Sequence, residues 1–289
     1  MTHLRSAVYV APPIPLDTPK GATWSPISCT LIYSKRSAVL VDTPITVAQN
    51  EDLVKWIKDI APNRTLSYIY ITHGHGDHWF GIPVLLKHFP EAIPLATAGT
   101  INHMKEQISD EFFKREWEFR FPSQIHKPFM LAQELPPTTG LKFYLEDQWE
   151  LQVFECGHAD MADSTFLWVP DLRLAVCGDV VYGQVHQMLM EANTKAKRDE
   201  WLHAIDMVRA LDPLYVVAGH KRAEEIDGTW HLEATKEYIK DFEKVLQTDP
   251  KDAAEVFKKM VALYPDRFNP GALRLSAMGA FMVPKEARI

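Results

Sequence analysis

The stretch at residues 67–78 reads SYIYITHGHGDH: an apolar, β-branched run followed directly by a histidine-rich loop. The run is typical of a buried β-strand. Residues two apart in an extended loop point the same way, so His73 and His75 can converge on one ion, and the intervening glycines allow the loop to turn. Asp77 and His78 can then face a second ion. Because imidazole and carboxylate suit zinc and the stretch holds no cysteine, it predicts a catalytic metal site.

Similar β-branched runs recur on both sides of this stretch and predict further strands. Amphipathic helical patterns at Leu53–Ile60, Ile82–Phe89 and Trp201–Leu211 lie between some of them. Because helices intervene only at intervals, we expect an α/β protein whose two-sheet core lies between layers of helices. The runs are Ile27–Ser34, Ala38–Pro44, Ser67–His73, Trp149–His158, Ser164–Val169, Arg173–Asp179 and Leu214–His220.

Three of the other runs end in residues that could complete a metal centre: His158, Asp179 and His220. Each follows an apolar run, where a strand delivers its last residue to the edge of the sheet. We therefore expect two zinc ions, with Asp179 and a hydroxide bridging them. The expected ligands are His73, His75 and His158 for one ion, and Asp77, His78 and His220 for the other.

The ordered set AVLVD, HGHGDH, CGH, CGD and AGH resembles the five motifs of the metallo-β-lactamase superfamily, over roughly residues 27–222. The resemblance implies a four-layer αβ/βα sandwich with a two-zinc cleft at the edge of the sheets, and it implies hydrolytic chemistry. Asp42 matches the aspartate of the first motif, which in relatives supports the metal loop without binding metal.

Departures from the family pattern indicate which kinds of enzyme within the superfamily are less expected. Asp179 stands where the zinc enzymes that destroy antibiotics carry a cysteine, so an antibiotic-resistance enzyme is disfavoured. A histidine at 75, where flavo-diiron proteins carry glutamate, disfavours an iron redox centre. The third motif reads GHADMADS instead of the commoner GHTxGS. Tyr182 follows Asp179 at a spacing similar to that of the tyrosine in acyl-homoserine lactonases, which implies a phenol that assists at the substrate carbonyl.

Two regions, residues 100–140 and the segment after residue 228, depart from the alternation of strands and helices. Residues 100–140 form an insertion with a polar helix expected at Ile101–Arg115 and then an aromatic, proline-rich loop; such long segments either form lids or pack for stability. We predict a catalytic domain at residues 1–228 and a C-terminal helical extension at 229–289 packed on it. Residues that could line a substrate pocket are Trp79, Trp117, Phe119, Phe121 and Met188.

The charge balance and the cysteine count limit the partners and the compartment. Thirty-one basic residues against 38 acidic ones give a net charge of −7, and no basic stripe suggests a nucleic-acid partner. Three scattered cysteines do not form a disulfide framework. The N-terminal prolines do not suit a signal peptide, and no apolar run is long enough to span a membrane. We expect a cytoplasmic protein that acts on a small molecule, with its oligomeric state left open.

The reaction expected from these residues is hydrolysis of a small cyclic amide or ester, by attack of the metal-bridging hydroxide on the carbonyl carbon. The substrate would be a lactam, such as a benzoxazolinone-type xenobiotic, or a lactone. Asp77 would carry a proton to the leaving group, and Tyr182 would stabilise the oxyanion. The alternatives are a thioesterase similar to glyoxalase II, a phosphodiesterase similar to tRNA-processing enzymes, and a non-catalytic metal-binding relative.

Overall fold

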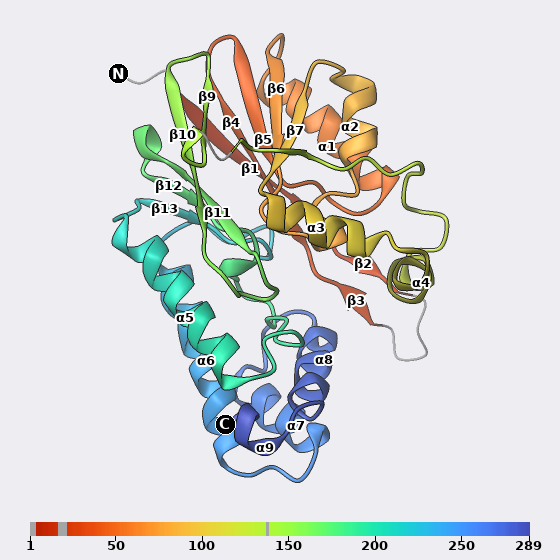
Figure 1. Ribbon diagram of the computed structural model, residues 1–289, viewed down its shortest axis with the longest axis vertical. Helices are drawn as coiled ribbons and strands as arrows, with labels where there is room; N and C mark the ends of the chain where they lie inside the picture. The colour runs from red at the N-terminus through yellow and green to blue at the C-terminus, as the bar shows by residue number, and fades with distance from the viewer. Residues whose placement is uncertain (1–3, 17–21, 137–138) are drawn as a thin grey trace.

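The computed structural model describes residues 4–16, 22–136 and 139–289, and it arranges the chain as two facing β-sheets covered by helices (Figure 1). Residues 1–3, 17–21 and 137–138, which belong to the predicted catalytic domain and its insertion, lie outside the described residues. The architecture confirms the predicted αβ/βα sandwich and the helical C-terminal extension. Within the described residues, no helix has the length and apolar character needed to span a membrane.

The first sheet has the strand order β1-β4-β5-β6-β7-β8. The pairings from β1 to β5 are antiparallel, and those from β5 to β8 are parallel. A two-stranded ribbon, β2–β3, stands apart from this sheet. The strands are β1 (Arg5–Ala11), β2 (Ile14–Pro15), β3 (Thr23–Trp24), β4 (Ile27–Tyr33), β5 (Ser37–Val41), β6 (Thr65–Tyr70), β7 (Ile93–Ala96) and β8 (Gln133–Glu134).

The second sheet has the order β13-β12-β11-β10-β9. It comprises β9 (Lys142–Leu145), β10 (Trp149–Glu155), β11 (Thr165–Val169), β12 (Leu174–Val176) and β13 (Tyr215–Val217). Its last two strands run parallel, whereas the other pairs are antiparallel. Because β12 and β13 are parallel neighbours, the residues that follow them emerge at the same edge of the sheet.

Three apolar clusters hold the layers together. Between the sheets, residues such as Val39, Tyr70, Leu167 and Val176 are buried in one cluster. Outside the first sheet, α1 (Val47–Ile60) and α2 (Ile82–His88) contribute to a second cluster, and outside the second sheet, α5 (Lys195–Ala210) and α6 (Trp230–Gln247) contribute to a third. Full burial of one such aliphatic side chain stabilises the fold by about 1.5–3 kcal/mol, so alternating apolar residues decide which face turns inward.

The insertion forms two helical pieces rather than one helix. The first, α3 (Ala98–Gln107), begins before the predicted start and has Thr97 as its N-cap. The Ser109 hydroxyl donates to the Glu106 carbonyl where α3 ends. A short α4 (Asp110–Phe112) and a π-helical turn (Phe113–Glu118) follow. The predicted helix at Ile101–Arg115 is therefore corrected, because the chain breaks at Ser109.

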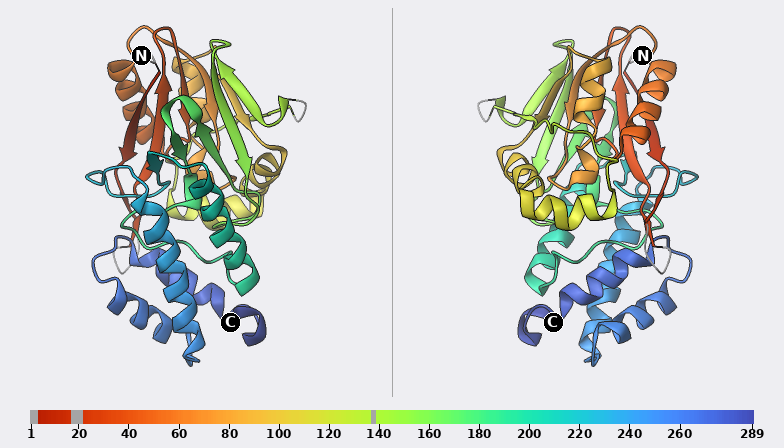
Figure 2. Two further views of the ribbon diagram at one scale, coloured as in Figure 1. Left: turned by 90° about the vertical axis from the view of Figure 1, so that its left-hand side faces the viewer. Right: turned by 90° about the vertical axis from the view of Figure 1, so that its right-hand side faces the viewer.

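The C-terminal helices extend beyond one end of the sheets (Figures 1 and 2). After α6 come α7 (Ala253–Leu263), α8 (Pro270–Ala280) and α9 (Lys285–Arg288). Asp249 has a φ of 54°, which separates α6 from α7. Apolar residues of α6, α7 and α8 belong to the same buried cluster as the outer face of the second sheet. The extension and the sandwich therefore share one core.

Candidate metal centre

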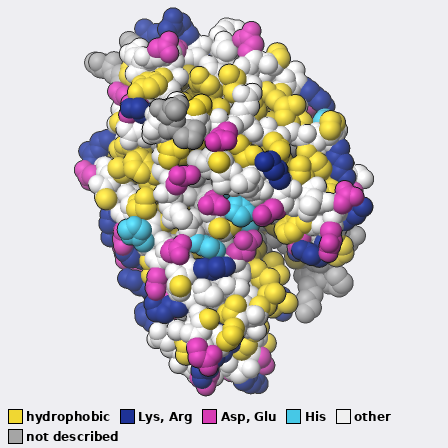
Figure 3. All heavy atoms as spheres, viewed as in Figure 1, with side chains coloured by type: hydrophobic (Ala, Val, Ile, Leu, Met, Phe, Trp, Pro, Cys, Tyr) yellow, Lys and Arg dark blue, Asp and Glu magenta, His cyan; other side chains and the backbone are white. Residues whose placement is uncertain are grey.

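The ends of β6, β12 and β13 bring the predicted ligands together. The loop after β6 turns through the 3-10 turn Gly76–His78, and Asp179 lies in another such turn, Gly178–Val180, after β12. His220 follows β13. The His220 Nε2 atom lies 3.2 Å from Asp179 Oδ2, and His78 Nε2 lies 3.2 Å from Asp179 Oδ1. Figure 3 shows histidine and acidic side chains near the centre of one face of the molecule.

Three groups of candidate ligand atoms form within this cluster. In each group, one atom from every member lies within 4.8 Å of the others. The groups share members and form one continuous centre, which suits two neighbouring ions. They are His73, His78 and Asp179; His73, His75 and Asp160; and Asp77, His78 and His220.

Backbone and hydroxyl partners fix the tautomers of two of these histidines. His220 Nδ1 donates to the Pro26 carbonyl at 2.6 Å, and His73 Nδ1 contacts the Thr72 hydroxyl oxygen at 3.0 Å. A neutral imidazole whose Nδ1 donates has its lone pair on Nε2. The Nε2 atoms of both residues therefore face the cluster as metal ligands would.

Asp42 fixes the tautomer of His78 in the same way. Its Oδ2 accepts hydrogen bonds from His78 Nδ1 at 2.9 Å and from the Thr72 hydroxyl at 2.8 Å, while its Oδ1 accepts from the Thr72 amide at 2.9 Å. The Asp42 backbone has a φ of 61°, a left-handed conformation that Asp tolerates better than most residues. The side chain is 2% exposed, so it lies behind the metal loop rather than in the centre.

Unpartnered buried atoms test whether the centre fits a metal. His73 Nε2, Asp160 Oδ2 and Asp179 Oδ1 are buried and have no hydrogen-bond partner among the described residues. Buried polar atoms are nearly always paired, and leaving one unpaired costs about 1–3 kcal/mol. These three atoms belong to the candidate ligand groups. A cation coordinated by nitrogen and oxygen would satisfy all three, so the residues present fit a divalent metal.

The electrostatics of the centre are dominated by close opposite charges. Burial alone lowers the pKa of His78, but the carboxylates of Asp179 and Asp77 hold it well above its usual value. Burial alone raises the pKa of Asp179, yet His220 and His78 hold it well below its usual value. The His78 imidazole thus retains its proton next to an ionised carboxylate, whereas burial holds the pKa of His73 well below its usual value. A metal ion would displace the His78 proton and take over its charge.

His158 is the one predicted ligand that the described structure does not bring into the candidate groups. No candidate group among the described residues includes it, and its Nδ1 donates to the Ala159 carbonyl at 2.8 Å. Gly157 has a φ of 71° and turns the chain before His158. From the same loop, Asp160 joins a candidate group, with Oδ2 2.8 Å from His75 Nδ1. Sequence reasoning did not select Asp160; the signal was the departure of GHADMADS from the usual motif.

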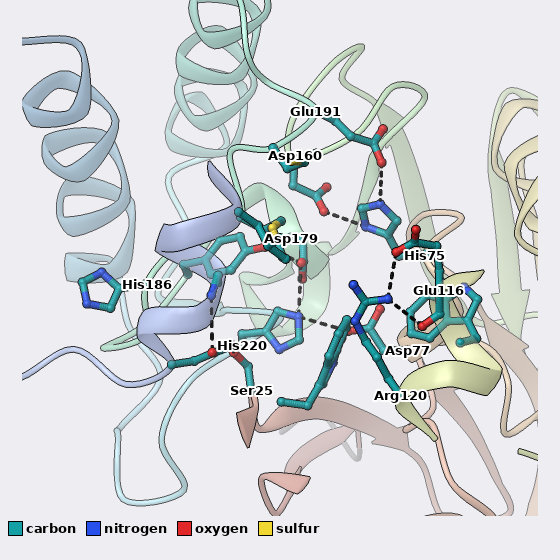
Figure 4. A pocket seen from close by; sticks show the side chains of 18 of the residues that line it. Ser25, His75, Asp77, Glu116, Arg120, Asp160, Asp179, His186, Glu191 and His220 are labelled. Carbon is teal, nitrogen blue, oxygen red and sulfur yellow. Dashed lines mark hydrogen bonds and ion pairs between the residues drawn. The ribbon is translucent and has the colours of Figure 1, made fainter. Parts of the chain in front are cut away.

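A pocket opens onto the centre between the insertion and the C-terminal helices (Figure 4). Its metal-side wall includes His75, Asp77, Asp160, Asp179, Tyr182 and His220. The remaining wall is largely apolar and contains Trp24, Phe112, Trp117, Met188, Met190, Ala272 and Leu275. Asn269 also lines the pocket and donates to the Ser25 hydroxyl at 2.8 Å, which joins the start of α8 to the segment after β3.

The predicted pocket residues divide between the wall, the core and the surface. Trp117 and Met188 line the pocket. Trp79 is fully buried, and its Nε1 donates to the Gly74 carbonyl at 2.9 Å, so it supports the metal loop. Phe121 is also fully buried, whereas Phe119, two residues away along the helical turn, is 73% exposed. The assignment of Trp79, Phe119 and Phe121 to the wall is therefore corrected.

Two aromatic residues contact the carboxylates of the centre. The Tyr182 hydroxyl donates to Asp179 Oδ2 at 2.5 Å, and burial together with the Asp179 charge raises the pKa of that hydroxyl well above its usual value. Tyr182 therefore stays protonated. Trp24 Nε1 donates to Asp77 Oδ2 at 2.9 Å, and its ring packs 5.5 Å from that of Trp117. The sequence patterns gave no signal for Trp24.

Sequence comparison agrees with this geometry. The profile of the metallo-beta-lactamase superfamily matches residues 22–220. The chain is 25% identical over 245 residues to a metallo-beta-lactamase type 2 of Bacteroides fragilis, covering 84% of this chain and 86% of that protein. It is 37% identical over 65 residues to the lactamase-like protein aptB of Emericella nidulans, a match that covers 21% of this chain and 19% of that protein.

Solved structures give the same fold. The mono-zinc form of the metallo-beta-lactamase FIM-1 from Pseudomonas aeruginosa aligns with a TM-score of 0.57 at 14% identity, covering 83% of this chain and 92% of that one. A metallo-beta-lactamase from Hirschia baltica aligns with a TM-score of 0.55 at 18% identity, covering 82% and 93%. Together with the profile match and the His/Asp groups, these findings show that the chain belongs to the metallo-beta-lactamase superfamily and is a metal-dependent hydrolase.

Proposed function

We propose that this hydrolase uses two zinc ions to open a small cyclic amide or ester, preferably a lactam fused to an aromatic ring, and otherwise a lactone. The observation that carries the proposal is the pocket wall: aromatic and methionine side chains lead directly to the His/Asp centre. A flat, apolar ring gains most from contact with such a wall, while its carbonyl group faces the charged end.

The ligand groups support two metal positions. His73 and His75 would hold one ion, Asp77, His78 and His220 would hold the other, and Asp179 would lie between them. Bound zinc supplies Lewis acidity for a carbonyl oxygen and lowers the pKa of water toward neutrality. Because the centre contains no cysteine ligand in the described chain, the donors are nitrogen and oxygen only.

The protein's own residues would handle orientation and proton transfer. Trp24 holds the Asp77 carboxylate by a hydrogen bond, which leaves the other oxygen of Asp77 to carry a proton to the leaving group. Tyr182 lines the pocket and its hydroxyl stays protonated, with its one proton donated to Asp179 Oδ2. With Asp179 engaged by metal, the hydroxyl would turn from that carboxylate and donate to the oxygen on which negative charge develops. A positioned donor of this kind contributes about 10²–10³ in turnover.

The alternative is a thioesterase similar to glyoxalase II, favoured by the contribution of α8 to the pocket. The charge of the wall argues against it. Of the described residues that line the pocket, Arg120 is the only Arg or Lys, and it is already paired with Glu116 at 2.8 Å. A glutathione thioester carries two carboxylates and would need more cations than this wall offers.

We also propose a cytoplasmic location, supported by three buried, free cysteines: Cys29, Cys156 and Cys177. A reducing compartment keeps such thiols unpaired.

The test is a hydrolysis assay with zinc-loaded protein on three substrates: a benzo-fused lactam, an acyl-homoserine lactone and a glutathione thioester. The expected order of kcat/KM is lactam, then lactone, then thioester. A thioester preferred over both rings would replace the proposal with the alternative. Metal analysis accompanies the assay, because less than about 0.2 zinc per chain after loading would indicate a non-catalytic relative.

A further inference from the structure

The Asp160 carboxylate lies at the inner end of the loop that departs from the family motif. The side chain is fully buried. Its Oδ1 accepts a hydrogen bond from the Met161 amide at 2.8 Å, which fixes the carboxylate plane. Its Oδ2 lies 2.8 Å from His75 Nδ1 and 3.9 Å from His73 Nε2, yet has no hydrogen-bond partner among the described residues.

The surroundings of His75 decide which cation can lie between its Nδ1 atom and Asp160. His75 Nε2 lies 3.1 Å from Glu191 Oε1, so in the neutral ring that nitrogen carries the proton and donates it to Glu191. The Nδ1 atom then has a lone pair directed at Asp160 Oδ2, which is also an acceptor. Two acceptors at 2.8 Å repel each other unless a cation lies between them. Burial lowers the pKa of His75, but Asp160 and Glu191 hold it well above its usual value, so a proton on Nδ1 can occupy this place in the metal-free protein, and a metal ion would replace that proton. Figure 4 shows the His75 ring between the two carboxylates.

The spacing of the three atoms suits a metal ion. Ligand atoms about 2.0–2.2 Å from a tetrahedral zinc lie roughly 3.3–3.6 Å from one another. The distances from Asp160 Oδ2 to the two imidazole nitrogens, 2.8 and 3.9 Å, lie on either side of that range. His73 Nε2 and Asp160 Oδ2 are both buried atoms that lack a partner. The third atom, His75 Nδ1, completes the group.

We propose that Asp160, and not the motif residue His158, is the third protein ligand of the first metal position. This inference rests on the proposed metal function. His158 has other partners: its Nδ1 donates to the Ala159 carbonyl, and its amide donates to Glu200 Oε2 at 3.2 Å. The first position is therefore built from two imidazoles and one carboxylate, with Glu191 orienting His75 as an outer partner.

The exchange of an imidazole for a carboxylate changes the charge and the metal preference of the centre. With Asp77 and Asp179, Asp160 makes three carboxylates, which balance three of the four positive charges of two divalent ions. With His158 the balance would be two of four. Oxygen donors also favour harder ions such as Mn²⁺ more than imidazole does. The wild-type preference for zinc over manganese is consequently expected to be smaller at this position than in an Asp160→His variant.

The test is cobalt titration of metal-stripped protein, followed by visible absorption and by metal analysis after desalting. Asp160→Asn is expected to weaken one of the two positions by at least about 100-fold, so that the retained cobalt falls from two equivalents to one. His158→Ala is expected to retain both equivalents, with affinities within about threefold of wild type. Asp163→Asn, in the same loop but exposed and paired with His103, is the matched control.

Each result decides the assignment. Loss of one equivalent in His158→Ala, with two retained in Asp160→Asn, would overturn the inference while leaving the metal function intact. Wild-type protein that binds no cobalt would instead overturn the proposed function itself. Circular dichroism checks the fold, and if Asp160→Asn does not fold, His158→Ala alone decides: two equivalents support Asp160, and one equivalent refutes it.

Discussion

Replacing Asp42 with asparagine is expected to weaken metal binding by about tenfold to a hundredfold while the protein stays folded. Asp42 Oδ2 accepts hydrogen bonds from His78 Nδ1 and from the Thr72 hydroxyl. In the variant an NH₂ group takes the place of Oδ2, so His78 Nδ1 must become the acceptor, and its proton moves to Nε2. That proton would point at the metal and block the lone pair that binds it.

The size of the effect follows from which contacts survive. The amide oxygen of the variant still accepts from the Thr72 backbone at the Oδ1 position, and asparagine tolerates the left-handed backbone at residue 42. The expected loss of metal affinity therefore comes from the changed tautomer of His78. A tenfold to hundredfold loss of affinity corresponds to about 1.4–2.7 kcal/mol.

The assay is competition for zinc against a chromophoric chelator, with thermal unfolding of the metal-free protein measured in parallel. Asp59→Asn, which removes an exposed carboxylate on α1, is the control and should bind zinc as wild type does. Affinity of Asp42→Asn within twofold of wild type would refute the tautomer argument. A large drop in the melting temperature of the metal-free variant would show that the carboxylate acts on folding instead.

Three further predictions concern Tyr182 and Gly219, which both lie next to Asp179, and Glu146, which lies far from the metal centre. Tyr182→Phe should lower kcat by roughly 10²-fold with zinc affinity within about threefold of wild type; kcat within twofold would remove the hydroxyl from the reaction. Gly219→Ala should lower zinc affinity by at least about tenfold, because the added Cβ would lie 2.2 Å from Asp179 Oδ1 and 2.5 Å from the Gly178 carbonyl carbon; chelator competition that finds wild-type affinity contradicts this. Burial alone raises the pKa of Glu146, but hydrogen bonds from Ser34, Ser37 and Arg36 hold it at about 2. Since that pKa lies below the usual 4.5, the contribution of Glu146 to stability is present above about pH 4.5 and is lost as the pH falls toward 2. Glu146→Gln should therefore be less stable in urea by about 1 kcal/mol at pH 7, and the difference from wild type should shrink at pH 3; an equal difference at both values would exclude the charge as the cause.

The strands that carry the centre could be predicted because they are mostly buried and rich in apolar and β-branched residues. The predicted runs contain β4, β10, β11, β12 and β13 and overlap most of β5 and β6, which begin one and two residues earlier. The strands β7 and β8 gave weaker signals, since β7 contains Pro94 and β8 has only two residues, and both depend on pairing with a neighbour. Tertiary contacts, which no local pattern records, place them in the sheet.

Residues from distant parts of the chain limited the prediction of the site. Motif spacing brought the His73 loop and Asp179 together correctly in space, but it could not show which residue of the Gly157–Ser164 loop turns inward. That choice depends on a glycine with positive φ and on a side chain that bonds the next amide. Trp24 and Leu275 reach the pocket from segments far from every motif.

The position of α8 separates two tasks in this protein. Asn269, Ala272 and Leu275 line the pocket without belonging to any of the ligand groups. Mutations on this helix can therefore alter which molecules enter while the chemistry at the metal ions is preserved. Substitutions along this one C-terminal helix could therefore change the range of substrates during evolution without any change in the histidine loops.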